Sequence, residues 1–129
     1  MTLATATAVG YLAWDPKWPA ILAAWIPSNL LLTCVSEETV FRGILQRHLG
    51  RALSGRVPAS AFVALVVCAA AFGVVHIAGG MTYVLLATLA GIGYGAAYYA
   101  TGRVEAGILV HFLLNLSHLI LFTYPFAAQ

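Results

Sequence analysis

Two adjacent carboxylates and an arginine, Glu37, Glu38 and Arg42, lie in one of the most apolar stretches of the chain. A charged side chain at membrane depth is costly, so residues of this kind usually belong to a functional site. In a helix, Glu38 and Arg42 lie four residues apart on one face, where they can pair. Glu37 is rotated by roughly 100° from Glu38, because a helical turn takes 3.6 residues. The pattern predicts a structural role for Glu38 and leaves Glu37 available for chemistry.

The composition excludes a soluble domain. Of the 129 residues, 62% are hydrophobic and 8% are charged, whereas soluble domains carry about 25% charged residues. A net charge of +2 without a basic run gives no indication of a nucleic acid as partner. We therefore expect one small domain, 1–129, with an all-α fold: a polytopic bundle of transmembrane helices.

Four membrane spans are expected, separated by turns rich in glycine and proline. Their predicted ranges are 18–50, 59–76, 81–100 and 104–124. Pro27 should kink the first of them. An apolar segment at the N-terminus, 1–14, precedes the spans and is shorter than the roughly 20 residues that a span needs.

Small residues recur at four-residue spacing in the third span, at Ala87, Gly91 and Gly95. This spacing predicts close packing of helices. The glycine-rich run does not indicate a nucleotide loop, because no strand precedes it. Cys34 and Cys68 both lie in apolar stretches, and we interpret them as small buried hydrophobic residues.

Positive residues near the span ends predict an orientation. Arg47, Arg51 and Arg56 lie in the first loop and Arg103 in the third, whereas Lys17 is alone on the opposite side. By the positive-inside rule, the arginine-bearing loops face the cytoplasm. Both termini then face outward.

Two further spans carry polar residues. His76 lies one turn after Phe72, and Asn115 lies one turn after His111; His118 continues the second of these faces. Each polar side chain is expensive in lipid, and together they can line a polar cavity. The sequence therefore predicts a site that draws on several spans.

The depths of these residues can be compared through the helical rise of 1.5 Å per residue. On this basis Glu37, His76 and Asn115 reach the same depth to within about one turn. His111 falls lower. The sequence thus places it beneath the other three, unless the helices tilt.

The three polar motifs are, in chain order, Glu37-Glu38-xxx-Arg42, Phe72-xxx-His76 and His111-xxx-Asn115. In this order they resemble the motifs EExxxR, FxxxH and HxxxN of the CAAX-protease and bacteriocin-processing family, also called ABI. The resemblance covers residues 30–119. It implies an intramembrane endopeptidase of a family best known for cleaving after a prenylated cysteine.

The resemblance also implies roles for single residues. It assigns catalysis to Glu37, His76, His111 and Asn115. The first two would activate the attacking water, and the other two would stabilise the oxyanion. Glu38 and Arg42 would hold the site in shape. Such a glutamic-type mechanism needs no cofactor.

A zinc enzyme is the alternative mechanism. Glu37, His76 and His111 can supply three ligands and leave a fourth position open, as catalytic zinc sites do. The HExxH motif is absent, and the resemblance implies a glutamate mechanism. We therefore expect no metal.

Two functions without catalysis are also compatible with buried polar residues. A transporter could use buried Glu and His as a proton relay, but it should show paired halves with broken helices. A scaffold or immunity-type protein is the other reading. The presence of every matched polar residue favours the enzyme.

The expected partners are the lipid bilayer and a membrane-anchored or prenylated protein substrate. The resemblance leaves three substrates open: a CaaX tail, a leader peptide and a C-terminal sorting tail. We expect a multi-pass protein of a prokaryotic inner membrane. Family members usually carry more than four spans, which suggests a minimal core or an oligomer.

Overall fold

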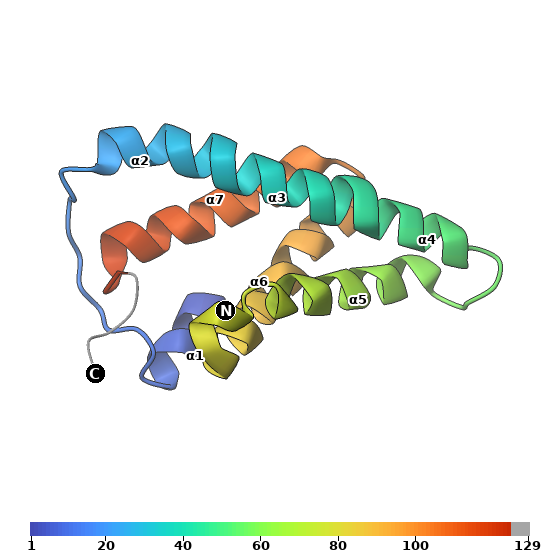
Figure 1. Cartoon of the computed structure of the whole chain (residues 1–129), viewed down its shortest axis with the longest axis horizontal. Helices are drawn as coiled ribbons and strands as arrows, with labels where there is room; N and C mark the ends of the chain where they lie inside the picture. Colours follow the sequence, from blue (N-terminus) through green and yellow to red (C-terminus); the bar gives the residue numbers. More distant parts are fainter. Residues whose placement is uncertain (125–129) are drawn as a thin grey trace.

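The computed structural model describes residues 1–124, and in that part of the chain all regular elements are helices (Figure 1). This confirms the expected all-α fold. In chain order the elements are α1 (Thr2–Ala8), α2 (Leu22–Ser28), η1 (Asn29–Val35), α3 (Ser36–Glu38), η2 (Thr39–Gln46), α4 (Arg47–Leu53), α5 (Ser60–Val74), η3 (Ile77–Gly79), α6 (Gly80–Thr101) and α7 (Val104–Leu121). Segments η1 and η2 are π-helical, and η3 is a short 3-10 helix.

Elements α2 to α4 follow one another without a break and form one long helix over 22–53, called the rod below (Figure 1). The sequence predicts this helix over 18–50, with a kink at Pro27. Pro27 does lie inside α2, where its missing N–H removes one hydrogen bond of the helix. The rod nevertheless continues, and its π-helical winding begins two residues later in η1.

The rod begins at Leu22, four residues later than predicted. The chain just before the predicted start is tied to the end of α7. The N–H groups of Asp15 and Lys17 donate to the carbonyls of Leu121 and Ile120, at 2.9 and 2.8 Å.

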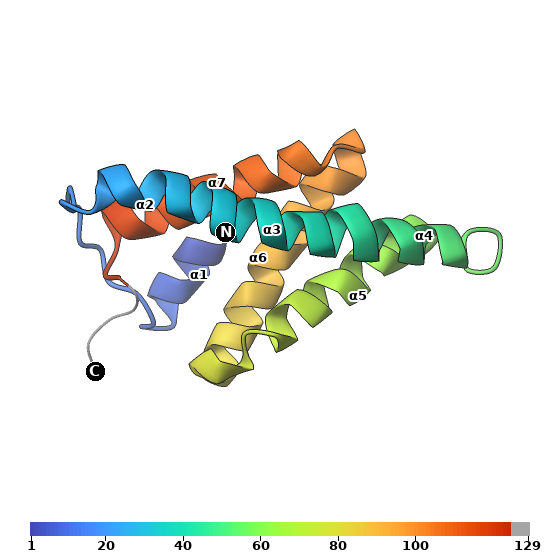
Figure 2. The same ribbon diagram turned by 45° about the horizontal axis from the view of Figure 1, so that its top comes forward.

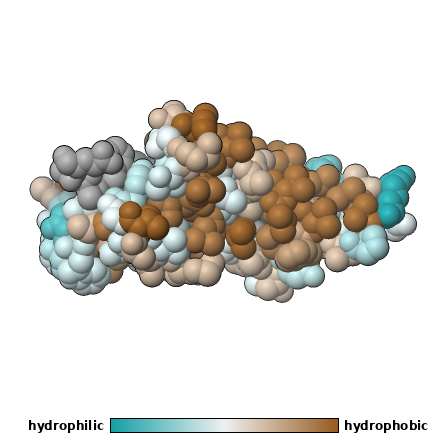
Figure 3. All heavy atoms as spheres, turned by 90° about the horizontal axis from the view of Figure 1, so that it is seen from below, coloured by the Kyte–Doolittle hydropathy of each residue, from teal (hydrophilic) through white to brown (hydrophobic). Residues whose placement is uncertain are grey.

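Two helical stretches are long and apolar enough to cross a bilayer. They are Ile77–Thr101, with a mean hydropathy of 1.5, and Val104–Leu121, with 1.7. Helix α5 is apolar as well, but its 15 residues fall short of the roughly 20 of a typical span. The described residues thus contain two candidate spans by length and composition, against the four expected. Figure 3 shows a largely apolar face, with hydrophilic residues toward the two ends of the long axis.

Helices α5, α6 and α7 begin at or next to their predicted first residues, but α5 and α7 end earlier than predicted. Helix α7 ends at Leu121, since Phe122 is extended with φ −133°. Helix α5 ends at Val74. His76 consequently lies in the turn between α5 and η3 and not on a span.

Close packing of α5 against α6 confirms the prediction from the small residues. Ala87, Gly91 and Gly95 are all buried. A Cβ atom added at Gly91 would lie 3.3 Å from the backbone of Ala69 on α5, tighter than most contacts in folded proteins. The two backbones can therefore approach because Gly91 and Gly95 lack side chains and Ala87 carries only a methyl group. Cys34 and Cys68 are free and fully buried, as expected.

The rod presents one buried polar stripe to the other helices. Its members are Cys34, Glu38, Arg42 and Gln46, which recur at every fourth residue. In a regular α-helix such a stripe would drift by about 40° at each step, because four residues exceed one turn. A π-helix bonds each N–H to the fifth residue before it and winds more residues into each turn. Segments η1 and η2 thus keep the stripe facing the bundle.

The N-terminal segment packs beside the helices that follow it, with α1 alongside α6 (Figure 2). Ala6, Leu12 and Leu86 form a buried apolar cluster, and Leu3 and Tyr11 pack against it. The apolar segment that the sequence identifies as too short to span is therefore part of the core. It covers the region in which the polar motifs meet.

Candidate active site

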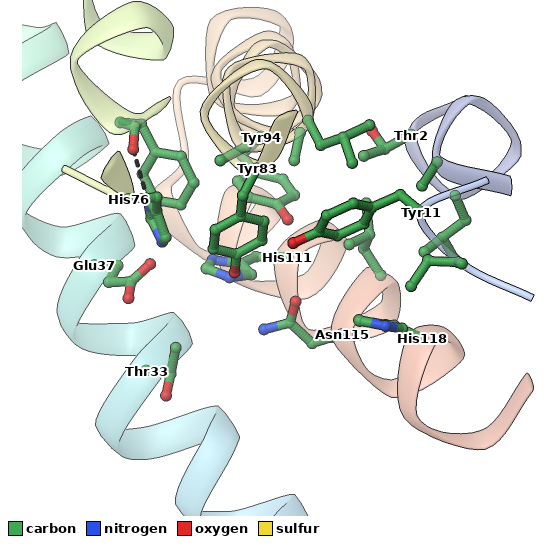
Figure 4. A pocket seen from close by; sticks show the side chains of 18 residues that line it. Thr2, Tyr11, Thr33, Glu37, His76, Tyr83, Tyr94, His111, Asn115 and His118 are labelled. Atoms are coloured by element: carbon green, nitrogen blue, oxygen red, sulfur yellow. Dashed lines mark hydrogen bonds between the residues drawn. The ribbon is translucent and has the colours of Figure 1, made fainter. Parts of the chain in front are cut away.

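The four residues to which the motifs assign catalysis line one cavity of about 120 Å³ (Figure 4). They are Glu37 on α3, His76 in the turn after α5, and His111 and Asn115 on α7. The sequence placed His111 beneath the other three. The structure brings all four residues to one cavity, because the helices are tilted against one another (Figure 2) and depth along one helix does not equal depth along another.

Glu37 presents its carboxylate to this cavity. Its Oε2 atom is buried and has no hydrogen-bond partner in the described part of the chain. Figure 4 shows the carboxylate directed toward the ring of His76. Glu37 also makes no ion pair with a described residue, so its charge is available to a molecule that enters the cavity.

His76 is held in one orientation by its own turn. Its Nδ1 atom lies 2.7 Å from the carbonyl oxygen of Phe72. A carbonyl can only accept, so Nδ1 carries the proton and Nε2 of the neutral ring is left as an acceptor. The ring lies against Phe72, at 4.7 Å between centroids, and meets Tyr83 edge to face at 5.4 Å.

Glu38 and Arg42 form the predicted ion pair, with Arg42 Nη1 at 2.9 Å from Glu38 Oε1 and both side chains fully buried. They lie behind the cavity and do not line it. Arg42 Nη2 donates to the carbonyl oxygen of Gly91 on α6, at 2.7 Å. Gly107 on α7 makes room for the carboxylate, since a Cβ atom there would lie 2.8 Å from Glu38 Oε2.

Aromatic rings surround the guanidinium of Arg42. Its central carbon lies 5.0 Å from the ring centre of Phe72, 5.3 Å from Tyr94 and 5.9 Å from Phe41. Each distance is within the range of a cation–π interaction. Together with the Glu38 carboxylate, these rings offset the cost of burying the charge, and they fix α5 and α6 against the rod.

His111 connects the buried pair to the cavity. Its Nδ1 atom lies 3.0 Å from Glu38 Oε1, so Nδ1 donates and Nε2 remains for the cavity side. The ring stacks on Tyr94, with 4.3 Å between centroids and 11° between planes. Because Glu38 holds one ring nitrogen and Tyr94 stacks on one face of the ring, the imidazole of His111 has little freedom to rotate.

Asn115 is oriented by the rod. Its Nδ2 atom donates to Asn29 Oδ1 at 3.3 Å and approaches Cys34 Sγ at 3.9 Å. The Cys34 thiol donates to the same oxygen of Asn29, at 3.3 Å. Asn29 and Cys34 are five residues apart, and the π-helical winding of η1 brings them to one face. The amide nitrogen of Asn115 thus points to η1, as Figure 4 shows.

Sequence reasoning missed one whole face of the cavity, which α6 supplies. Among its members are Tyr83, Ala87, Ala90 and Tyr94. Their spacing of four, three and four residues is that of a single helical face, and this signal could have identified them. It also missed the contribution of the N-terminal segment, from which Thr2 and Tyr11 reach the same cavity (Figure 4).

No metal-binding group is formed by the residues that the structure describes. Among residues 1–124, no three His, Cys, Asp or Glu side chains are arranged to hold an ion. Glu37, His76 and His111 line one cavity but do not meet this condition. To ligate one zinc ion, they would have to move closer together.

The type II CAAX prenyl endopeptidase Rce1-like family matches residues 16–117, which is most of the chain. The three motifs lie inside this range. The chain therefore belongs to this family of membrane-embedded proteases, and the resemblance drawn from the motifs is confirmed. Searches among curated proteins and among solved structures gave no match.

Proposed function

We propose that this protein is an intramembrane endopeptidase of the glutamic type, which hydrolyses a peptide bond of a prenylated, membrane-anchored protein. The observation that carries the proposal is the meeting of Glu37, His76, His111 and Asn115 at one cavity among apolar helices. The family match supports the reaction and the class of substrate.

Glu37 and His76 would activate the attacking water. The carboxylate has an unpartnered oxygen, and the ring of His76 keeps Nε2 as an acceptor because Phe72 uses its Nδ1–H. One water between them can donate to both. As its oxygen attacks the substrate carbonyl carbon, one proton passes to Glu37, a step of general base catalysis.

The proton taken by Glu37 would then go to the nitrogen of the scissile bond. The C–N bond breaks as that nitrogen leaves, and the products are a carboxylic acid and an amine. Neither an electron acceptor nor a further reactant is needed. Hydrolysis by this route uses only the substrate, one water and the side chains of the cavity.

The oxyanion would be stabilised from α7. His111 uses Nδ1–H for Glu38, so donation from Nε2 requires a doubly protonated ring, and the Glu38 carboxylate stabilises that charge. Asn115 donates toward Asn29 in this arrangement, and its amide would turn toward the substrate. One preorganised donor of this kind typically contributes about 10²–10³-fold.

We also propose that the rod and α5 cross the membrane together with α6 and α7, which gives four spans in one domain, 1–129. The 32 residues of the rod reach up to about 48 Å, more than the roughly 30 Å of the hydrocarbon core. Helix α5 reaches about 22 Å and would need its flanking turns. The arginine-bearing loops would face the cytoplasm of a prokaryotic cell.

Two alternatives to this proposal remain: a zinc-dependent form of the same protease, and a scaffold or immunity-type protein without activity. The experiment that separates enzyme from scaffold uses purified protein in lipid vesicles. Three fluorogenic substrates are compared: a prenylated CaaX peptide, a leader peptide and a C-terminal sorting tail, each anchored in the bilayer.

The unprenylated CaaX peptide serves as the matched control. We expect cleavage of the prenylated peptide and little cleavage of its control. Cleavage of only the leader peptide or only the sorting tail would mean that the protein is a protease with a different class of substrate. A folded protein that cleaves none of them would favour the scaffold.

A further inference from the structure

A second cavity, of about 610 Å³, lies at the end of the molecule where α4 meets the start of α5. The last turn of α6 and the start of α7 complete it. It shares no lining residue with the candidate active site. Figure 2 shows this end of the rod far from α1, which covers the active-site cavity. The second cavity is therefore a separate site.

Two arginines one turn apart on α4, Arg47 and Arg51, line this cavity. Both are exposed, and neither makes a hydrogen bond or ion pair with a residue in 1–124. The other arginines outside the active site differ in this respect: Arg56, in the turn after α4, donates to the carbonyl oxygen of Ala52, and Arg103 lies 4.0 Å from Glu105. The cavity thus holds two positive charges that lack a counter-charge.

The start of α5 adds to the positive potential. Ser60 and Ala61, the first two residues of this 15-residue helix, line the cavity. N–H groups in the first turn of a helix have no partner within the helix, and they carry the positive end of its dipole. A phosphate is a typical ligand of such a helix end. The two arginines and the N-terminus of α5 therefore favour the same ligand, a phosphate group.

Gln46 supplies a neutral acceptor at the same cavity. Its side chain is only 4% exposed, and its Nε2 donates to the carbonyl oxygen of Gly95 at 3.2 Å. Its Oε1 has no partner among the described residues. A buried acceptor without a donor is costly. Oε1 lies against Gly95, so a ligand that offers a hydroxyl or ammonium group next to its phosphate can donate to it only after a small shift of the Gln46 amide.

With α6 and α7 as membrane spans, as proposed above, the cavity lies at a membrane boundary. The two candidate spans turn into one another at 102–103, directly beside it. Tyr98 and Tyr99, both in its lining, are of the residue type enriched at the level of lipid headgroups. Basic pockets between membrane helices on the cytoplasmic side bind anionic headgroups. The occupant that fits is a lipid, because the cavity opens where lipid phosphates lie.

We propose that this cavity binds the headgroup of an anionic phospholipid. The phosphodiester contacts Arg47, Arg51 and the N-terminus of α5, and the Gln46 amide shifts so that its Oε1 accepts from a headgroup hydroxyl. Bound in this way, the lipid joins α4, α5 and α6 at the end of the bundle opposite the N-terminal segment. Phosphatidylglycerol, which carries one negative charge and two hydroxyls, is the probe with this chemistry.

The test is lipid retention by the purified full chain, measured by native mass spectrometry after incubation with phosphatidylglycerol or phosphatidylcholine. We expect retention of phosphatidylglycerol in preference to phosphatidylcholine. The variant Arg47→Gln/Arg51→Gln should weaken this retention by roughly tenfold or more, since hydrogen bonds to charged groups contribute on that order. The variant Arg47→Lys/Arg51→Lys keeps the charges and should retain part of the phosphatidylglycerol binding. Its partial binding would show that the loss in Arg47→Gln/Arg51→Gln is not due to a folding defect.

The matched control is Arg56→Gln/Arg103→Gln, which removes the same charge from outside the cavity. It should retain phosphatidylglycerol like the wild type. Equal losses in both double variants would mean diffuse attraction to surface charge and would overturn the proposal, as would unchanged binding in Arg47→Gln/Arg51→Gln. Glycerol phosphate, a soluble source of the same chemistry, should bind far more weakly; binding as tight as that of the lipid would overturn the lipid assignment.

Discussion

The Nδ1 atom of His111 lies 3.0 Å from Oε1 of Glu38. His111 lines the cavity and Glu38 does not, so the carboxylate of Glu38 orients a cavity residue from behind. The same oxygen accepts a hydrogen bond from Arg42 at 2.9 Å. One carboxylate thus neutralises a buried cation and orients a histidine. The two glutamates of the motif differ accordingly, since Glu37 faces the cavity and makes neither contact.

Removal of the buried carboxylate should therefore affect stability and activity together. In Glu38→Ala, Arg42 loses its counter-charge in a fully buried position, which typically costs about 3–5 kcal/mol. Arg42→Ala should be destabilised for the converse reason. Thermal unfolding in detergent measures this, with peptide cleavage alongside. If either variant melts like the wild type, the pair does not contribute to stability as its burial implies.

Glu37→Gln should abolish proteolysis and leave the fold intact. The amide is nearly isosteric with the carboxylate but cannot accept a proton from water, and general acid–base catalysis contributes about 10²–10⁴-fold. The measurement is turnover of the prenylated peptide by protein that still purifies as a folded species. Glu105→Gln is the matched control, because Glu105 is exposed and remote from the cavity. Near-normal turnover by Glu37→Gln would show that the Glu37 carboxylate takes no part in the reaction.

Residue spacing was sufficient to predict the buried pair and the helices that carry the motifs. Glu38 and Arg42 could be paired because i,i+4 proximity is a local property of a helix. Likewise, the close approach of α5 and α6 followed from the absence of side chains at Gly91 and Gly95. Such features depend on short stretches of chain, and charged residues in an apolar background make them conspicuous.

Features that depend on how helices cross were not predictable in this way. The depth of His111 relative to Glu37 is set by helix angles, which no single helix encodes. The hydrogen bond of Asn115 to Asn29 joins α7 to η1 across 86 residues of chain. The stack of Tyr94 on His111 joins α6 to α7, and only the packed bundle reveals it.

Gly107→Ala tests the space beside the buried carboxylate. The new methyl group would lie 2.8 Å from Glu38 Oε2, so the carboxylate or α7 must shift. Overpacking of this kind costs about 1–3 kcal/mol, and the shift should also displace His111 and lower turnover. Gly93→Ala on α6 is the control, because nothing lies within 4 Å of its added Cβ.

In that control, helix propensity alone should leave stability unchanged or raise it by up to about 1 kcal/mol. Unfolding temperature and peptide cleavage are measured for both variants. Equal behaviour of Gly107→Ala and Gly93→Ala would show that the carboxylate is not confined against α7.

A metal ion is not expected at the candidate site. A catalytic zinc would need Glu37, His76 and His111 within about 2.0–2.2 Å of one ion, whereas these side chains in the described structure do not form a group able to hold one. Asn115 would be an unusual zinc ligand, yet it lines the same cavity. The glutamic mechanism uses all four residues, and the zinc mechanism leaves Asn115 without a direct part in the reaction.

We therefore expect the purified protein to contain no stoichiometric zinc and to stay active after strict chelation. Elemental analysis and peptide cleavage before and after chelation provide the measurement. Asn115→Ala should lose about 10²–10³-fold in turnover, as the loss of one oxyanion donor does, while its unfolding temperature changes little. If chelation abolishes activity, added zinc restores it and Asn115→Ala remains active, then the zinc mechanism is correct, because that combination requires the ion and gives the amide no role at the oxyanion.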